Sequence, residues 1–135
     1  MSDDAGHTSN RHDARERAFH LLYETEMKGD DIASVLAALP VGPDEFATEL
    51  VVGVGETQAD LDSVIAAHAR NWDVDRMPAL DRAILRLATY ELMFRPDVPT
   101  AVAISEAVEL AKSYSTDDSS RYVNGVLSAI ASEVR

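Results

Sequence analysis

Hydrophobic residues recur every three or four positions along most of the chain, the spacing that places them on one face of an α-helix. No window alternates hydrophobic and polar residues with the period of two expected for a half-buried strand. We therefore expect an all-α protein. Proline, glycine and capping residues interrupt the pattern, and the predicted helices fall at about residues 13–29, 31–39, 43–71, 79–94, 100–114 and 119–134.

Local signals mark several of these helix ends. The apolar periodicity of the first helix begins at Asp13, and Gly29 is expected to end it. Asp30 or Asp31 can cap the short second helix, and Pro43 suits the first turn of the third.

An interruption near residues 71–78 divides the predicted helices into two groups. Residues 1–10 are small, polar and acidic, and we expect them to form a flexible arm. Residues 11–135 are expected to form one compact domain, with halves at roughly 11–72 and 76–135.

The segment 79–94 is almost entirely apolar, so a helix formed by it must be largely buried. Arg82 and Arg86 fall on one side of this helix, and we expect them to share an exposed strip. Asp81 and Glu91 are expected at the exposed edge of the same helix.

The charge balance limits the possible partners. The 135 residues include 24 acidic and 12 basic side chains, which give a net charge of −12. Such a molecule repels nucleic acid and anionic membranes except at a local basic patch. No apolar run is long enough for a membrane span, so a cytoplasmic protein is the expectation.

Sequence signals for catalysis or metal binding are missing. There is no cysteine, no nucleophile elbow and no phosphate-binding glycine loop, and the four histidines lack metal-ligand spacing. Gly53 and Gly55 form a GxG without the strand and third glycine of a dinucleotide site, so they, like Gly125, are expected to permit close packing. We expect no enzyme activity, no metal and no cofactor.

Basic residues cluster at one place, the start of the first helix, where Arg11, Arg15 and Arg17 lie within seven residues. They are either a solvated helix face or a contact for nucleic acid. Tyr122, beside Arg121, is likewise either an aromatic residue at the edge of the core or a stacking surface for an unpaired base.

Six segments of the chain carry distinctive motifs. Residues 11–23 have an Ala-Arg-x-Arg-Ala core, and the others are DRAILRLATYEL at 81–92, DVP at 97–99, VAISEAVELAK at 102–112, DS at 118–119 and YVNGVL at 122–127. In this order and spacing, the segments resemble the NusB family of bacterial transcription antitermination factors, and residues 11–23 are similar to the basic N-terminal motif of that family.

The resemblance implies two packed three-helix bundles, counted as about seven helices, and a role without catalysis. It implies binding to the ribosomal protein NusE, to the single-stranded boxA element of nascent ribosomal RNA, and to the antitermination complex of RNA polymerase. By motif position it implies partner contacts at Asp81, Arg82 and Glu91. The implied RNA contacts are Arg11, Arg15, Arg17, Asp118, Ser119, Arg121 and Tyr122.

Two alternatives remain open from the sequence. One is a protein-interaction module that self-associates, as a homodimer for example, with little intrinsic affinity for RNA. The other is the helical RNA-binding half of an RNA-modifying enzyme whose catalytic part is a separate chain.

Overall fold

A computed structural model describes the backbone of residues 3–70 and 73–135, and the side chains of residues 11–70 and 73–135. Within this part the chain is helical and contains no strand, which confirms the expected all-α class. The elements are α1 (Asp3–Lys28), α2 (Ile32–Ala38), α3 (Glu45–His68), the short 3-10 helix η1 (Val74–Arg76), α4 (Ala79–Phe94), α5 (Thr100–Tyr114) and α6 (Asp117–Val134).

Helix ends lie where short-range chemistry fixes them. Gly29 adopts a left-handed φ of 68° directly after α1, a conformation that costs glycine little. The Asp31 carboxylate accepts from the backbone N–H of Ser34 at 2.7 Å and caps α2. Asp44 caps α3 in the same way, so Pro43 precedes the helix and does not stand in its first turn.

Helix α1 begins at Asp3, about three turns before the expected start at Asp13. Residues 3–12 include no proline, the residue that most strongly interrupts a helix. The hydrophobic pattern did not include these residues because they are polar.

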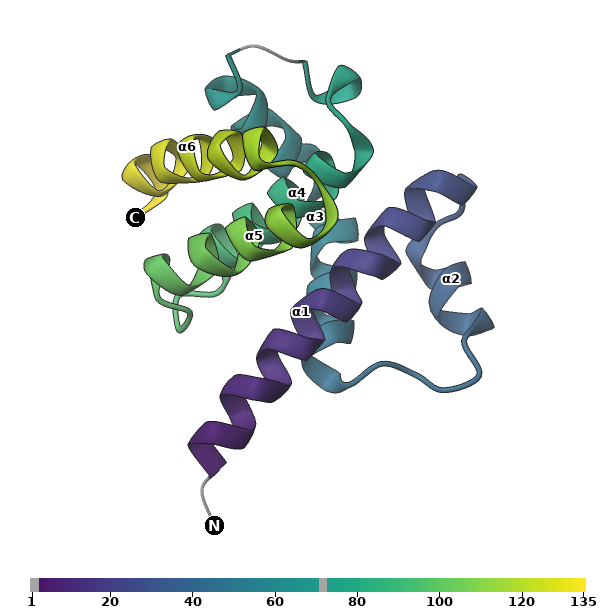
Figure 1. Cartoon of the computed structure of the whole chain (residues 1–135). Helices are drawn as coiled ribbons and strands as arrows, with labels where there is room; N and C mark the ends of the chain where they lie inside the picture. Colours follow the sequence, from purple (N-terminus) through teal and green to yellow (C-terminus); the bar gives the residue numbers. More distant parts are fainter. Residues whose placement is uncertain (1–2, 71–72) are drawn as a thin grey trace.

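Helix α4 lies at the centre of the fold, and α1, α3, α5 and α6 all pack against it (Figure 1). Helix α2 packs on α1 and α3 at the outer edge. One continuous hydrophobic core joins both groups of helices, because α4 contributes fully buried residues such as Ile84 and Leu85 between them. In the described part of the chain, no helix is long and apolar enough to cross a membrane.

Of the glycines expected to permit close packing, Gly53 has the clearest packing role. A Cβ atom at Gly53 would overlap the ring of Tyr90, so α3 and α4 approach closely only because residue 53 has no side chain. At Gly55 a Cβ would lie 3.4 Å from Ile32, an ordinary contact. A Cβ at Gly125 would meet nothing within 4 Å, so the expectation of close packing there is wrong.

Candidate nucleic-acid interface

Arg15 joins three helices instead of facing solvent. Its Nε lies 2.9 and 3.0 Å from the two carboxylate oxygens of Glu91 on α4, and its Nη1 lies 3.2 Å from Oε1 of Glu106 on α5. The Arg15 side chain is only 4% exposed. Arg15 is therefore not accessible for the RNA contact that the sequence predicted. A buried carboxylate needs a charged partner, and Arg15 is the partner of Glu91.

Arg11 and Arg17, the other two arginines of the basic cluster, remain at the surface. Arg17 is exposed and forms no ion pair with any side chain that the structure describes. Arg11 is partly exposed, lies 3.4 Å from Asp97 and has its guanidinium 4.6 Å from the centre of the Phe46 ring. The start of α1 therefore presents two accessible cations, and not three.

Three arginine side chains surround the ring of Phe46, an arrangement that the sequence analysis did not predict. The guanidinium groups of Arg11, Arg15 and Arg95 lie 4.6, 5.4 and 5.0 Å from the centre of its ring. Arg95 also donates to Asp97 at 2.9 and 3.0 Å, and this hydrogen bonding holds the pKa of Asp97 well below its usual range. No short-range signal predicts the cluster, because its members come from α1, α3 and the segment after α4.

The start of α6 carries one exposed pair of predicted RNA contacts. Asp118 lies in the first turn of this helix, and its carboxylate accepts from Arg121 at 2.9 Å. Both side chains are largely exposed to solvent. Thr116 caps the helix by accepting from the backbone N–H of Ser119 at 3.0 Å, so Asp118 is not needed as the cap.

Ser119 and Tyr122 face inward, which corrects their predicted roles. Ser119 is buried, and its hydroxyl donates to Oδ2 of Asp81 at 2.9 Å. Tyr122 packs against the hydrophobic core and is partly buried, as the alternative interpretation of a core-edge aromatic residue proposed. Burial, with the nearby charge of Asp81, raises the pKa of Tyr122.

The residues expected to contact a protein partner are also less accessible than predicted. Asp81 and Glu91 are 0% and 1% exposed, so neither carboxylate lies at an exposed edge of α4. Burial raises the pKa of Glu91, and the hydrogen bonds from Arg15 oppose this shift. The prediction that these two carboxylates contact a protein partner directly is therefore corrected, because neither is accessible.

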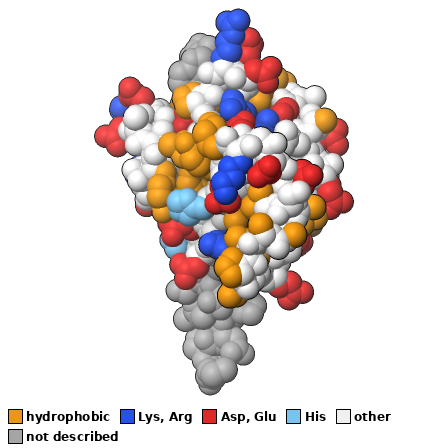
Figure 2. Space-filling view, turned by 90° about the vertical axis from the view of Figure 1, so that its right-hand side faces the viewer, with side chains coloured by type: hydrophobic (Ala, Val, Ile, Leu, Met, Phe, Trp, Pro, Cys, Tyr) orange, Lys and Arg blue, Asp and Glu red, His pale blue; other side chains and the backbone are white. Residues whose placement is uncertain are grey.

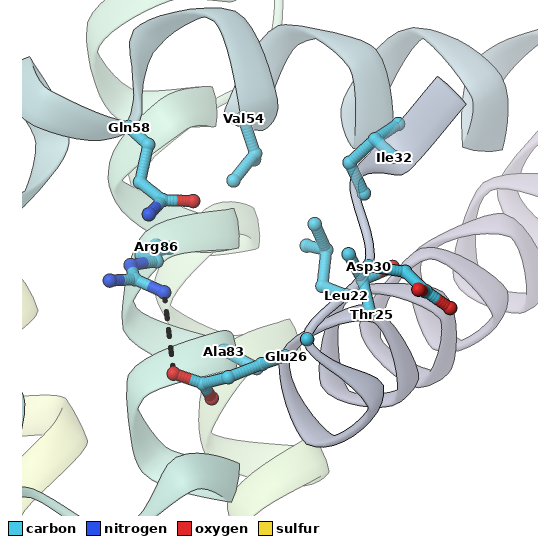
Figure 3. Close-up of a pocket in the computed structure, with 10 residues that line it drawn as sticks. Leu22, Thr25, Glu26, Asp30, Ile32, Val54, Gln58, Ala83 and Arg86 are labelled. Atoms are coloured by element: carbon cyan, nitrogen blue, oxygen red, sulfur yellow. Dashed lines mark ion pairs between the residues drawn. The ribbon is translucent and has the colours of Figure 1, made fainter. Parts of the chain in front are cut away.

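Arg82 and Arg86 do not form an exposed strip, because acidic residues of α1 and α3 cover them. Arg82 bonds to Glu26 and to two backbone carbonyls, and Arg86 forms a bidentate pair with Asp62 at 2.7 and 2.8 Å. Figure 3 shows Arg86 and Glu26 on the wall of a cavity of about 270 Å³ among α1, α3 and α4. The charged groups on this wall pair with one another. Arg82 and Arg86 therefore have a structural role, which is to neutralise the acidic residues packed against α4.

A polar seam between α1 and α5 was also not anticipated. His12 lies with Nδ1 2.9 Å from Oε2 of Glu106, and this hydrogen bond, with the charge of Glu106, raises the pKa of His12. Further along the seam Tyr114 donates its hydroxyl to Glu16 at 2.9 Å. The bond partners are 94 and 98 residues apart in the chain, so no sequence spacing predicts them.

The accessible cations near the predicted RNA motifs are few: Arg11 and Arg17 on α1, and Arg121 on α6. Figure 2 shows acidic side chains scattered over one face, mainly toward its edges, with basic groups at separate points among hydrophobic and uncharged surface. Electrostatic attraction for a polyanion is therefore confined to these local points.

Comparison with known proteins identifies the family of the chain. The family model described as "NusB family" matches residues 12–132. The transcription antitermination protein NusB of Saccharopolyspora erythraea is 49% identical over 90% of this chain and 86% of the relative, and that of Streptomyces griseus is 45% identical over 87% and 88%.

Solved structures agree with this assignment. NusB of T. maritima superposes with a TM-score of 0.83 at 36% identity, covering 91% of each chain. A crystal structure of antitermination factors NusB and NusE in complex with dsRNA contains a chain that superposes with a TM-score of 0.78 at 28% identity, covering 92% of this chain and 97% of that one. On the match over residues 12–132 and on these relatives, the chain belongs to the NusB family.

Proposed function

We propose that this chain is a transcription antitermination factor that binds the boxA element of nascent ribosomal RNA together with the ribosomal protein NusE. It acts as a binding adaptor in the antitermination complex of RNA polymerase, in the cytoplasm, and not as an enzyme. The observation that carries the proposal is the superposition, over 92% of this chain, on a protein solved with NusE and RNA.

The surface of this chain supports a shared RNA site. Arg11 and Arg17 on α1 and Arg121 on α6 are accessible cations at the positions of the predicted RNA contacts. With a net charge of −12, the chain alone attracts RNA weakly. Ribosomal proteins are generally basic, so a bound NusE would both complement the acidic surface and add cations beside the RNA.

Fluorescence anisotropy of a labelled single-stranded boxA RNA tests the proposal. The labelled RNA is titrated with this chain, with NusE, and with an equimolar mixture of the two. We expect the mixture to bind more tightly than either protein alone, and to bind a strand of the same composition in scrambled order less tightly. If the mixture binds boxA no better than NusE alone does, the proposed function is wrong.

A further inference from the structure

Three aromatic rings meet where α1 lies beside the end of α5. Phe19 is 1% exposed and forms the base of the cluster, with its ring centre 5.2 Å from that of His20 and 5.3 Å from that of Tyr114. His20 and Tyr114 pack edge to face at 4.8 Å. Both reach the surface, and Tyr114 is 36% exposed.

Hydrogen bonds fix the two exposed rings. The Tyr114 hydroxyl donates to Oε2 of Glu16 at 2.9 Å, and Nε2 of His20 lies 3.1 Å from the same hydroxyl oxygen. Because the hydroxyl proton is directed to Glu16, His20 must donate its Nε2 proton to Tyr114. The rings are therefore held in place before any ligand arrives, which lowers the entropy cost of binding to them.

The ring pair lies on elements that also carry accessible cations or lead to one. Arg17 precedes His20 by three residues on α1, so the two side chains are neighbours on that helix. Tyr114 ends α5, and Arg121 lies in the second turn of α6, after a short connection. Figure 1 shows the connection from α5 to α6 beside the middle of α1, and the Tyr114 bond to Glu16 joins the end of α5 to the same part of α1.

We propose that Tyr114 and His20 form a stacking platform for an unpaired base of single-stranded RNA, on a path from Arg17 to Arg121. The inference rests on the proposed function and names the group that holds the base. Tyr122 is less suited to this role because its ring packs against the core. Single-stranded RNA is commonly held by aromatic stacking beside a basic path.

Stacking also suits the local charge. Glu16, Asp13 and Glu106 lie beside the rings or on the adjoining seam, and they weaken attraction for phosphate there. The face of a base is uncharged, so it stacks on Tyr114 while the phosphates lie toward the arginines. This site therefore adds affinity that depends little on salt.

Strands carrying 2-aminopurine test the platform, because the fluorescence of this base falls when it stacks on an aromatic ring. A series of boxA strands with the probe at successive positions is bound to the complex of this chain with NusE. We expect Tyr114→Leu to weaken binding about 5- to 150-fold and to abolish the quenching at one position. Tyr114→Phe keeps the ring and should keep affinity within about twofold.

Two further variants complete the design. Phe94→Leu is the matched control, because Phe94 is also an exposed ring (41%) but ends α4, roughly 20 Å along that helix from Asp81 beside the α5–α6 connection. It should change neither affinity nor quenching. His20→Ala tests the platform independently if Tyr114→Leu lowers the thermal midpoint of unfolding, and should also reduce the quenching.

The outcomes separate this inference from the proposed function. If the parent complex binds boxA but both Tyr114→Leu and His20→Ala bind and quench as the parent does, the platform is wrong and the proposed function stands. If the parent complex does not bind boxA, both are wrong. Loss of affinity and quenching in the ring variants alone supports the platform.

Discussion

The hydroxyl of Ser119 donates to a buried carboxylate oxygen of Asp81 at 2.9 Å, which ties the first turn of α6 to the first turn of α4. Arg15 and Glu91 connect α1 to the other end of α4 in a similar way, through a buried ion pair of 2.8 Å. Two carboxylates of one helix thus hold both segments that resemble the RNA-contact motifs. Asp81 and Glu91 were expected to contact a protein partner. Instead they hold Ser119 and Arg15, which were expected to contact RNA.

Removal of the Asp81 carboxylate should destabilise the fold. Asp81 also accepts from Ser115 at 3.1 Å, so Asp81→Ala leaves two serine hydroxyls without their acceptor. We expect the free energy of unfolding to fall by about 2–4 kcal/mol in urea denaturation at pH 7. Asp81→Asn retains one acceptor oxygen and should cost less. Equal stability of Asp81→Ala and the parent would show that the network contributes nothing.

The pair of Arg15 and Glu91 should give a penalty that depends on pH. Arg15→Met leaves the buried Glu91 without its cation, and we expect a loss of about 3–5 kcal/mol at pH 7. Burial raises the pKa of Glu91, so the folded state holds a proton on this carboxyl above the pH at which the unfolded state releases it. Stability from this group is therefore present at low pH and lost as pH rises. Without Arg15 nothing opposes the effect of burial on Glu91, so the stability lost as pH rises is larger.

Urea denaturation of the parent and of Arg15→Met at pH 4.5 and pH 7 measures this effect. The difference between the two proteins should be smaller at pH 4.5, where Glu91 in the variant is neutral. The double variant Arg15→Met, Glu91→Leu serves as control and should recover much of the stability at pH 7. A penalty of equal size at both pH values would contradict the assigned role of the buried charge.

His12 should give a smaller effect of the same sign, because its charged form gains a partner in the folded state. Glu106 raises the pKa of His12 above 6.5, so the stability is fully present below that pH and is lost as pH rises through the folded pKa. The imidazole is largely exposed, and we expect a change of less than about 1 kcal/mol between pH 6 and pH 8. NMR titration of the His12 ring gives its pKa directly. His12→Gln should remove the corresponding part of the pH dependence of unfolding.

Arg11 and Arg17 should determine part of the salt dependence of RNA binding. If both contact phosphates, replacing both with Ala lowers the slope of log K against log salt by about 1.4, at roughly 0.7 for each single-strand contact. Arg70→Ala is the matched control, because Arg70 is exposed just beyond the far end of α3, roughly 35 Å along the helix from Phe46 and Arg11. Anisotropy titrations at four salt concentrations supply the slopes. An unchanged slope in the double variant would remove α1 from the RNA path.

Sequence reasoning was most successful where the physical cause is local. The cap on α2 was expected at Asp30 or Asp31 and is Asp31, and the end of α1 was expected at Gly29; both depend on residues within three or four positions. The hydrophobic period also gave the helical class, because burial of one helix face requires it.

The charged residues of the central helix could not be predicted in this way. A helix wheel treats Arg82 and Glu91 as solvent-facing because both are charged, yet their partners come from 56 and 76 residues away. Burial of a charge is favourable only when such a partner arrives, and that depends on how whole helices pack. The Tyr114 and His20 pair was missed for the same reason, since the contact spans 94 residues.

The absence of a side chain at Gly53, against the ring of Tyr90, couples the evolution of two positions. A methyl group at position 53 requires the end of the Tyr90 ring to move, so Gly53→Ala is accommodated most readily in a background in which residue 90 is already smaller. In the reverse order, a small residue at 90 leaves a void that a larger residue at 53 can later fill. Among related sequences, we therefore expect substitutions at these two positions to occur together, with the volumes changing in opposite directions.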